Sequence, residues 1–135
     1  MRNILVLLLL FTFIYSSAQA EDEKKADDIV YQNAYLEISP DIVSNVQGQA
    51  KYIRTSIQLM TNRADLLWEV EPHMPLIRHT LLMYLVDQKG ENISTPAGKE
   101  KLRKQLLKTI NEALNQHTAD KDIMTDLFFT SYYVK

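Results

Sequence analysis

Three histidines and two glutamates are the residues of this sequence best suited to chemistry, either as metal ligands or as general acids and bases. His73 and His79 are six residues apart, which places them on opposite faces of a helix, and His117 lies at the end of a separate predicted helix. On a helix, the carboxylates of Glu69 and Glu71 point in directions about 200° apart. We therefore expect no metal site, no paired-carboxylate site and no cofactor.

Nucleophilic catalysis and nucleotide binding also lack their usual motifs. The sequence has no cysteine, which excludes disulfides, thiolate zinc sites and cysteine nucleophiles. Ser94 and Ser131 have no G-x-S-x-G context, and three scattered glycines cannot form a phosphate-binding loop. The sequence therefore predicts a protein that is not an enzyme.

The charged residues favour a surface that binds protein or lipid. Fifteen lysines and arginines stand against 17 aspartates and glutamates, a balance that predicts no nucleic-acid partner. Lys101, Lys104 and Lys108 share one side of a predicted helix, which is either an ordinary solvated face or a contact for anionic lipid or an acidic partner. Arg78 lies within an apolar helix pattern, so its guanidinium must reach solvent or a carboxylate.

The first of two predicted helices follows a strand-like segment and positions Arg78. Asn62 is a candidate N-cap, and Pro72 and Pro75 each remove a backbone donor, so we expect a kink or break near Glu71. Apolar residues recur with alternating steps of three and four, which predicts one buried stripe. The stripe consists of Leu67, Val70, Met74, Ile77, Leu81 and Tyr84.

The second predicted helix carries the three lysines. Residues 88–92 form a predicted loop, and the sequence Ser94-Thr95-Pro96 then indicates a helix start, because a hydroxyl can cap free amides and proline fits the first turn. The helix should end near residues 116–117. Its predicted buried stripe is Leu102, Leu106, Ile110 and Leu114.

The remaining segments have β character. An apolar run at residues 29–38 is interrupted at 39–41, where proline breaks the run, and residues 42–46 resume as a short strand. After a turn at Gly48, residues 50–60 alternate so that the same face carries Ile53, Thr55, Ile57 and Leu59.

The last predicted strand, residues 123–134, is aromatic on both faces, which is typical of a central strand, a doubly covered strand or a subunit contact. The order strands, helix, helix, strand predicts an α+β domain. Its mostly antiparallel sheet would carry the two main helices on one face.

The N-terminal residues differ from the rest in composition. Residues 1–20 contain a short positive start, an apolar run and a small-x-small ending, so they predict a signal peptide, with a short uncleaved membrane anchor as the alternative. The apolar run would span about 18 Å as a helix, less than the bilayer core of about 30 Å. Residues 21–28 are predicted to be a flexible charged leader, and residues 29–135 a single exported domain.

Two blocks of the exported part are especially specific, MPLIR at residues 74–78 and STPAGKE at residues 94–100. Together with three further blocks, they resemble the flagellar basal body-associated protein FliL family. The resemblance extends from Tyr35 to Val134, and the blocks keep the family's order and spacing. The blocks lie at residues 45–48, 52–59, 73–82, 94–102 and 126–132.

This resemblance implies a non-enzymatic flagellar motor accessory protein with a domain similar to the stomatin-like SPFH fold. It implies assembly into a homo-oligomeric ring, association with stator and basal body proteins, and support of torque, motility and chemotaxis-linked rotation. The expected location is the periplasm, at the inner membrane and the flagellar basal body. The family usually carries a cytoplasmic stub and an uncleaved transmembrane helix, so the cleavable segment here suggests a FliL-like paralogue or a soluble variant.

We expect two partner-contact surfaces. The aromatic last strand, with Phe128 and Tyr132, would support self-association, and the basic helix face of Lys101, Lys104 and Lys108 would contact a stator or the membrane surface, with Arg78 as a further candidate. The alternative hypothesis is a soluble periplasmic α+β module that binds a small ligand between its helices and sheet.

Overall fold

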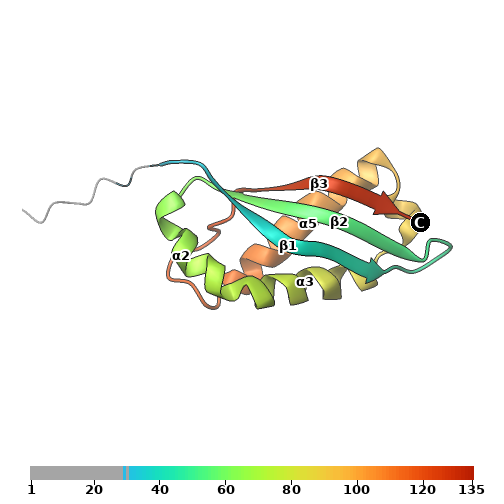
Figure 1. Cartoon of the computed structure of the whole chain (residues 1–135), viewed down its shortest axis with the longest axis horizontal. Coiled ribbons are helices and arrows are strands. Elements are labelled where there is room, and N and C mark those ends of the chain that lie inside the picture. The colour runs from blue at the N-terminus through green and yellow to red at the C-terminus, as the bar shows by residue number, and fades with distance from the viewer. Residues whose placement is uncertain (1–28, 30) are drawn as a thin grey trace, which may run out of the picture.

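The computed structural model describes residue 29 and residues 31–135. In this part of the chain, a three-stranded antiparallel sheet has the order β1 (Ala34–Asn45), β2 (Tyr52–Thr61) and β3 (Asp126–Val134). Two main helices, α3 (Met74–Val86) and α5 (Pro96–Leu114), lie on the same side of that sheet (Figure 1). The predicted α+β class, with an antiparallel sheet and two main helices on one face, is confirmed.

The predicted signal peptide at residues 1–20 and the predicted leader at 21–28 lie outside the described residues. Among the residues that the structure describes, no helix has the length and hydropathy to span a bilayer.

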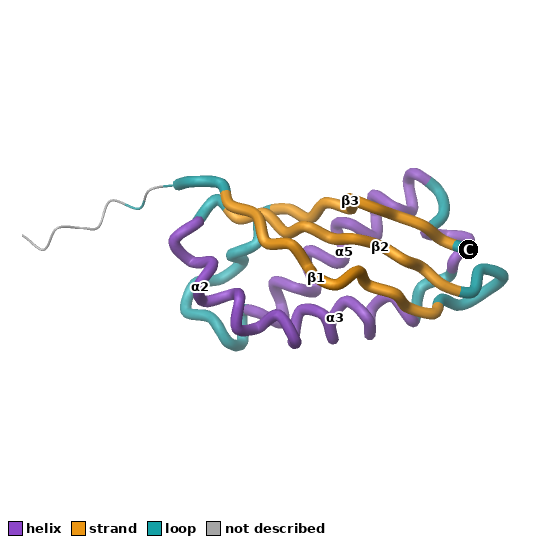
Figure 2. Tube along the Cα trace, in the orientation of Figure 1, coloured by secondary structure: helices purple, strands orange, loops and turns teal. Residues whose placement is uncertain are grey.

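The helices and the sheet form two layers that meet in one core. The contacts of α3 are with β1 and those of α5 with β3, and the two helices also contact each other (Figure 2). The central strand β2 directs its predicted apolar face into this core, where its side chains have 0% exposure: Ile53, Thr55, Ile57 and Leu59. The alternation expected for this strand is therefore confirmed.

The structure changes the interpretation of the first strand. The predicted break at residues 39–41 is a bulge within one continuous strand, because β1 pairs with β2 on both sides of a register shift between Ile38 and Ile42. Both isoleucines are buried, because the shifted register still places them opposite Ile57 and Thr55, which face the core from β2. The turn at Gly48 is confirmed, and its φ of 93° suits glycine.

The helical segment after β2 is interrupted, as the prolines predicted. It consists of η1 (Ala64–Leu66), α2 (Leu67–Val70), η2 (Glu71–His73) and α3, so a 3-10 turn occupies the expected break near Glu71. The N-cap prediction for Asn62 is wrong: Arg63 occupies the cap position without a side-chain cap bond, and its guanidinium pairs with Asp65 at 2.7 Å.

The predicted apolar stripe of this segment is mostly confirmed. Val70, Ile77 and Leu81 have 0% exposure, whereas Leu67, Met74 and Tyr84 are partly buried against the core. Leu85, which the stripe omitted, also has 0% exposure.

The start of α5 follows the predicted capping chemistry. The hydroxyl of Thr95 accepts a hydrogen bond from the backbone amide of Gly98 at 3.0 Å, and Pro96 is the first helical residue. The four predicted stripe residues, from Leu102 to Leu114, are all buried. The predicted loop at residues 88–92 is wrong in part, because Gly90–Ile93 forms the short helix α4, which buries Gly90 against Ala50.

The last strand is also shorter and differently placed than expected. It begins at Asp126, and it lies at the edge of the described sheet beside β2, so a central position, one of the three alternatives for this strand, does not hold within that sheet. Its two aromatic faces have different surroundings. Phe129 and Tyr132 pack against the core, whereas Phe128 and Tyr133 are exposed.

Candidate interaction surfaces

The sheet face opposite α3 and α5, here called the uncovered face, is rich in exposed aromatic side chains. Tyr35 and Phe128 have ring centroids 6.5 Å apart, and Tyr52 and Tyr133 form a second pair at 6.1 Å. Tyr35, Phe128 and Tyr133 are 53%, 39% and 51% exposed. No helix of the described chain covers these rings, so they form an accessible aromatic surface.

Polar side chains cross the middle of the uncovered face. The carboxylate of Asp41 accepts hydrogen bonds from Arg54 at 3.0 Å and from the hydroxyl of Ser56 at 2.7 Å. The hydroxyls of Ser56 and Ser131 are 2.7 Å apart, which extends the network to β3. The bond from Ser56, followed by those from Arg54, lowers the pKa of Asp41. These bonds hold the three strands together between the two aromatic pairs.

The two aromatic contact candidates of the last strand lie on opposite faces of it. Phe128 belongs to the uncovered face. Tyr132 is half-buried on the core side, where its hydroxyl donates to the carbonyl of Ile93 at 2.8 Å and the Nζ of Lys99 lies 4.8 Å from its ring centre. Burial raises the pKa of Tyr132 to about 12. The structure therefore gives Tyr132 a packing role and leaves Phe128 available for contact.

The three lysines of α5 lie together on its solvent side. Lys101, Lys104 and Lys108 are all exposed. Lys104 lies 3.6 Å from Glu100, and Lys108 lies 3.7 Å from Glu112, so two of the lysines have acidic neighbours. Exposed pairs of this kind contribute little to stability, and the face stays open to an anionic partner.

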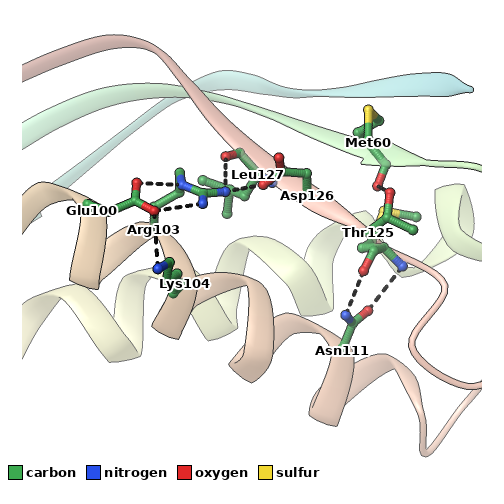
Figure 3. A network of polar contacts seen from close by, with 9 residues as sticks. Met60, Glu100, Arg103, Lys104, Asn111, Thr125, Asp126 and Leu127 are labelled. Atoms are coloured by element: carbon green, nitrogen blue, oxygen red, sulfur yellow. Dashed lines mark hydrogen bonds and ion pairs between the residues drawn. The ribbon is translucent and has the colours of Figure 1, made fainter.

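A more constrained ionic network lies at the start of α5, beside β3 (Figure 3). The guanidinium of Arg103 pairs with Glu100 at 2.8 Å and also contacts the carboxylate of Asp126, so it connects α5 with β3. The hydrogen bond from Arg103 is the main cause that lowers the pKa of Glu100 to about 2. This network fixes the edge strand to the helix layer.

Arg78 satisfies its charge in a way that the sequence did not indicate. Its guanidinium donates a hydrogen bond to the backbone carbonyl of Pro40, at the bulge of β1. The sequence predicted that this guanidinium reaches solvent or a carboxylate. Arg78 is partly exposed, and the protein acceptor it finds is the backbone carbonyl of Pro40 and not a carboxylate. Arg78 therefore connects α3 with β1.

A buried asparagine was missed in the sequence. The side-chain amide of Asn111 donates to the carbonyl of Met124 at 2.8 Å and accepts from the amide of the same residue at 3.1 Å (Figure 3). Asn111 is 8% exposed, and it positions the segment that leads into β3. Its signal in the sequence is its helical spacing, since Leu107 and Leu114, four residues before it and three after it, are apolar and pack in or against the core.

Their spacing in the sequence predicted that the three histidines lie apart, but two of them meet in the structure. The rings of His73 and His117 are 5.2 Å apart, because the chain after α5 returns to the junction between α2 and α3. A hollow of about 410 Å³ lies there, and its lining residues are Trp68, Glu69, Pro72, His73, His117 and Ala119. Within the described residues, no group of three or more histidines or acidic residues is arranged to hold a metal ion.

The alternative hypothesis, a small ligand bound between the helices and the sheet, needs a hollow at that place. The hollow lined by residues of α3, α4 and α5, such as Tyr84, Ile93 and Leu102, measures only about 90 Å³ and includes no residue of the three strands. Small-molecule sites usually have about 300 to 1,000 Å³.

Comparison with known proteins identifies the family of this fold. Residues 35–134 match the model of the family described as flagellar basal body-associated protein FliL. The chain is also similar to the flagellar protein FliL of Aquifex aeolicus (strain VF5), with 29% identity over 97 residues. That alignment covers 71% of this chain and 57% of the relative, so the chain matches little more than half of the relative's length. Because the family match covers both main helices and all of the sheet except Ala34, the chain belongs to the FliL family of flagellar basal body-associated proteins.

Proposed function

We propose that this protein is a non-enzymatic accessory component of the flagellar motor, which associates with stator and basal body proteins at the periplasmic side of the inner membrane. In this role it supports torque, swimming and chemotaxis-linked rotation. The family match over residues 35–134 supports the flagellar setting. The observation that carries a binding role is the uncovered face, with its exposed aromatic pairs.

Self-association is part of this proposal. Phe128 of β3 and Tyr35 of β1 form an exposed aromatic pair across the central strand β2, and β3 pairs only with β2 in the described sheet. Aromatic side chains contribute strongly to interfaces because they bury a large area with few rotatable bonds. We infer that copies of the domain assemble through this face into a ring, with an arrangement similar to that of SPFH domains.

The lysine face of α5 is the proposed second contact. Lys101, Lys104 and Lys108 lie on the helix layer, on the opposite side of the molecule from the uncovered face. An assembly formed through the uncovered face would therefore leave these lysines free for an acidic stator segment or anionic lipid.

The experiment that tests the function is deletion of the gene, followed by measurement of swimming speed and of swarming on stiff agar. We expect reduced motility under high load, and recovery when the wild-type gene is supplied in trans. A gene encoding Phe128→Lys should fail to restore swarming at an equal protein level, whereas a gene encoding Gln116→Lys, an exposed position after α5 and away from the uncovered face, should restore it. Unchanged motility of the deletion strain at high load would contradict the proposal.

Fractionation of a tagged protein tests the location. We expect the protein in the periplasmic or inner-membrane fraction, and recovery exclusively in the cytoplasm would overturn this part of the proposal. Replacement of all three lysines by glutamine should weaken association with the stator-containing membrane fraction without changing the domain's thermal stability.

A further inference from the structure

The hollow beside α2, here called the Trp68 hollow, exposes the chain's single tryptophan to solvent. Trp68 is 70% exposed, the highest value among the exposed large hydrophobic residues of the described chain. It shares the hollow of about 410 Å³ with Glu69, Pro72, His73 and His117. Tryptophan is among the residues most enriched at binding hot spots, so its exposure in a concave site points to a binding role.

The walls of the Trp68 hollow combine aromatic rings with one carboxylate. His73 and His117 contribute two imidazole rings with centroids 5.2 Å apart. The Oε2 of Glu69 accepts only a long hydrogen bond of 3.4 Å from the amide of Ala119. None of the lining residues is a lysine or an arginine, and Glu69 forms no ion pair with any residue of the described chain. The carboxylate is therefore available to an incoming cation.

We propose that the Trp68 hollow binds an arginine side chain of a partner polypeptide. The guanidinium stacks on the exposed indole of Trp68 and donates to the carboxylate of Glu69, while the aliphatic part of the side chain packs on Pro72. Arginine fits better than lysine because a planar guanidinium stacks on an aromatic face and can donate to a carboxylate at the same time. This site is separate from the uncovered face and from the lysine face of α5, and its occupant does not depend on the proposed motor role.

The neighbouring acidic residue Glu71 provides a matched control. It lies two residues from Glu69 and is exposed, but it does not line the hollow. Replacing each glutamate by glutamine removes the same charge from nearly the same place. A specific contact at Glu69 must therefore give a larger effect than general attraction by the acidic segment.

The test is a fluorescence titration, because Trp68 is the sole tryptophan and reports directly on the hollow. The protein is titrated with a capped tetrapeptide that contains two arginines, with the same peptide containing citrulline, and with chitotriose. We expect a saturable change in emission with the arginine peptide and none with citrulline. Glu69→Gln should weaken the binding about tenfold, and Glu71→Gln should change it less than about twofold.

Calorimetry with Trp68→Ala completes the test. We expect loss of peptide binding with an unchanged Tm, because the indole is mostly exposed and its removal opens no core cavity. No saturable response to the arginine peptide, or an equal response to the citrulline peptide, would overturn the proposal. So would equal effects of the two glutamine variants, or binding of chitotriose alone, which would identify the hollow as a carbohydrate site.

Discussion

The two faces of the sheet use the same strands for different purposes. On the core face, Ile53, Ile57 and Leu59 have 0% exposure beneath the helices, and their packing stabilises the domain. On the uncovered face, Tyr35 and Phe128 stay exposed around a network of hydrogen-bonded polar groups. Burial on the core face therefore stabilises the domain, while the exposed rings of the uncovered face can be exchanged at little cost to stability as long as the polar network between them is kept.

The largest effect should come from a cavity in the core face. Ile57→Ala removes a fully buried side chain of the central strand, and we expect a loss of about 2 to 4 kcal/mol in the free energy of unfolding. Urea denaturation measures this loss. Val43→Ala on β1, where Val43 is 55% exposed, is the control and should change stability by less than about 0.5 kcal/mol. Similar losses for the two variants would contradict the division between the faces.

The next largest loss of stability should come from the buried polar contact between Asn111 and Met124, which holds the segment before β3. Asn111→Ala leaves both the amide and the carbonyl of Met124 without their partner, so we expect a loss of about 2 to 3 kcal/mol. Gln116→Ala, at an exposed position after α5, is the comparison. If Asn111→Ala unfolds at the same urea concentration as the wild type, the segment before β3 does not depend on this contact.

A smaller effect on stability, but a clear one on association, is expected on the uncovered face. Phe128→Lys places a charge among the exposed rings and should weaken self-association at least about tenfold. The Tm should fall by only a few degrees, since Phe128 is 39% exposed. Sedimentation velocity measures the association. A variant that assembles like the wild type would remove Phe128 from the proposed interface.

The smallest effect concerns pH and the network that joins α5 to β3. The pKa of Glu100 is lowered from 4.5 to about 2, chiefly by its hydrogen bond from Arg103. A carboxyl with a lowered folded-state pKa stabilises the fold above its unfolded pKa, and this contribution is lost as the pH falls through the folded value. The stability difference between the wild type and Glu100→Gln should therefore be greatest above pH 4.5 and vanish near pH 2. If the stability difference stays constant across this pH range, the ion pair between Glu100 and Arg103 is not the cause of that difference.

The elements predicted best are those whose signal is local. The buried stripe from Leu102 to Leu114 follows directly from helical spacing, and the cap at Thr95 follows from a hydroxyl placed before a proline. Local sequence also predicted the interruption near Glu71, because a proline removes a backbone donor wherever the rest of the chain lies.

The predictions that failed depend on residues far apart in the sequence. Pro40 ends a strand by its local preference, yet pairing with β2 on both sides makes β1 continuous across it. His73 and His117 meet although 43 intervening residues separate them, because the chain after α5 turns back to α2. The edge position of β3 depends likewise on which strand it pairs with, and a strand's own composition does not specify its neighbour.

Residue types at short, regular spacings were enough to predict the α+β class, the apolar face of β2, most of the two buried helical stripes and the family resemblance. Long-range packing determines which aromatic residues stay exposed, which acceptor Arg78 binds, and how Trp68 comes to share a hollow with Glu69 and two histidines. Burial and contact require two segments of the chain, and local spacing describes only one of them. They are fixed when helices cover one face of the sheet and leave the other face open.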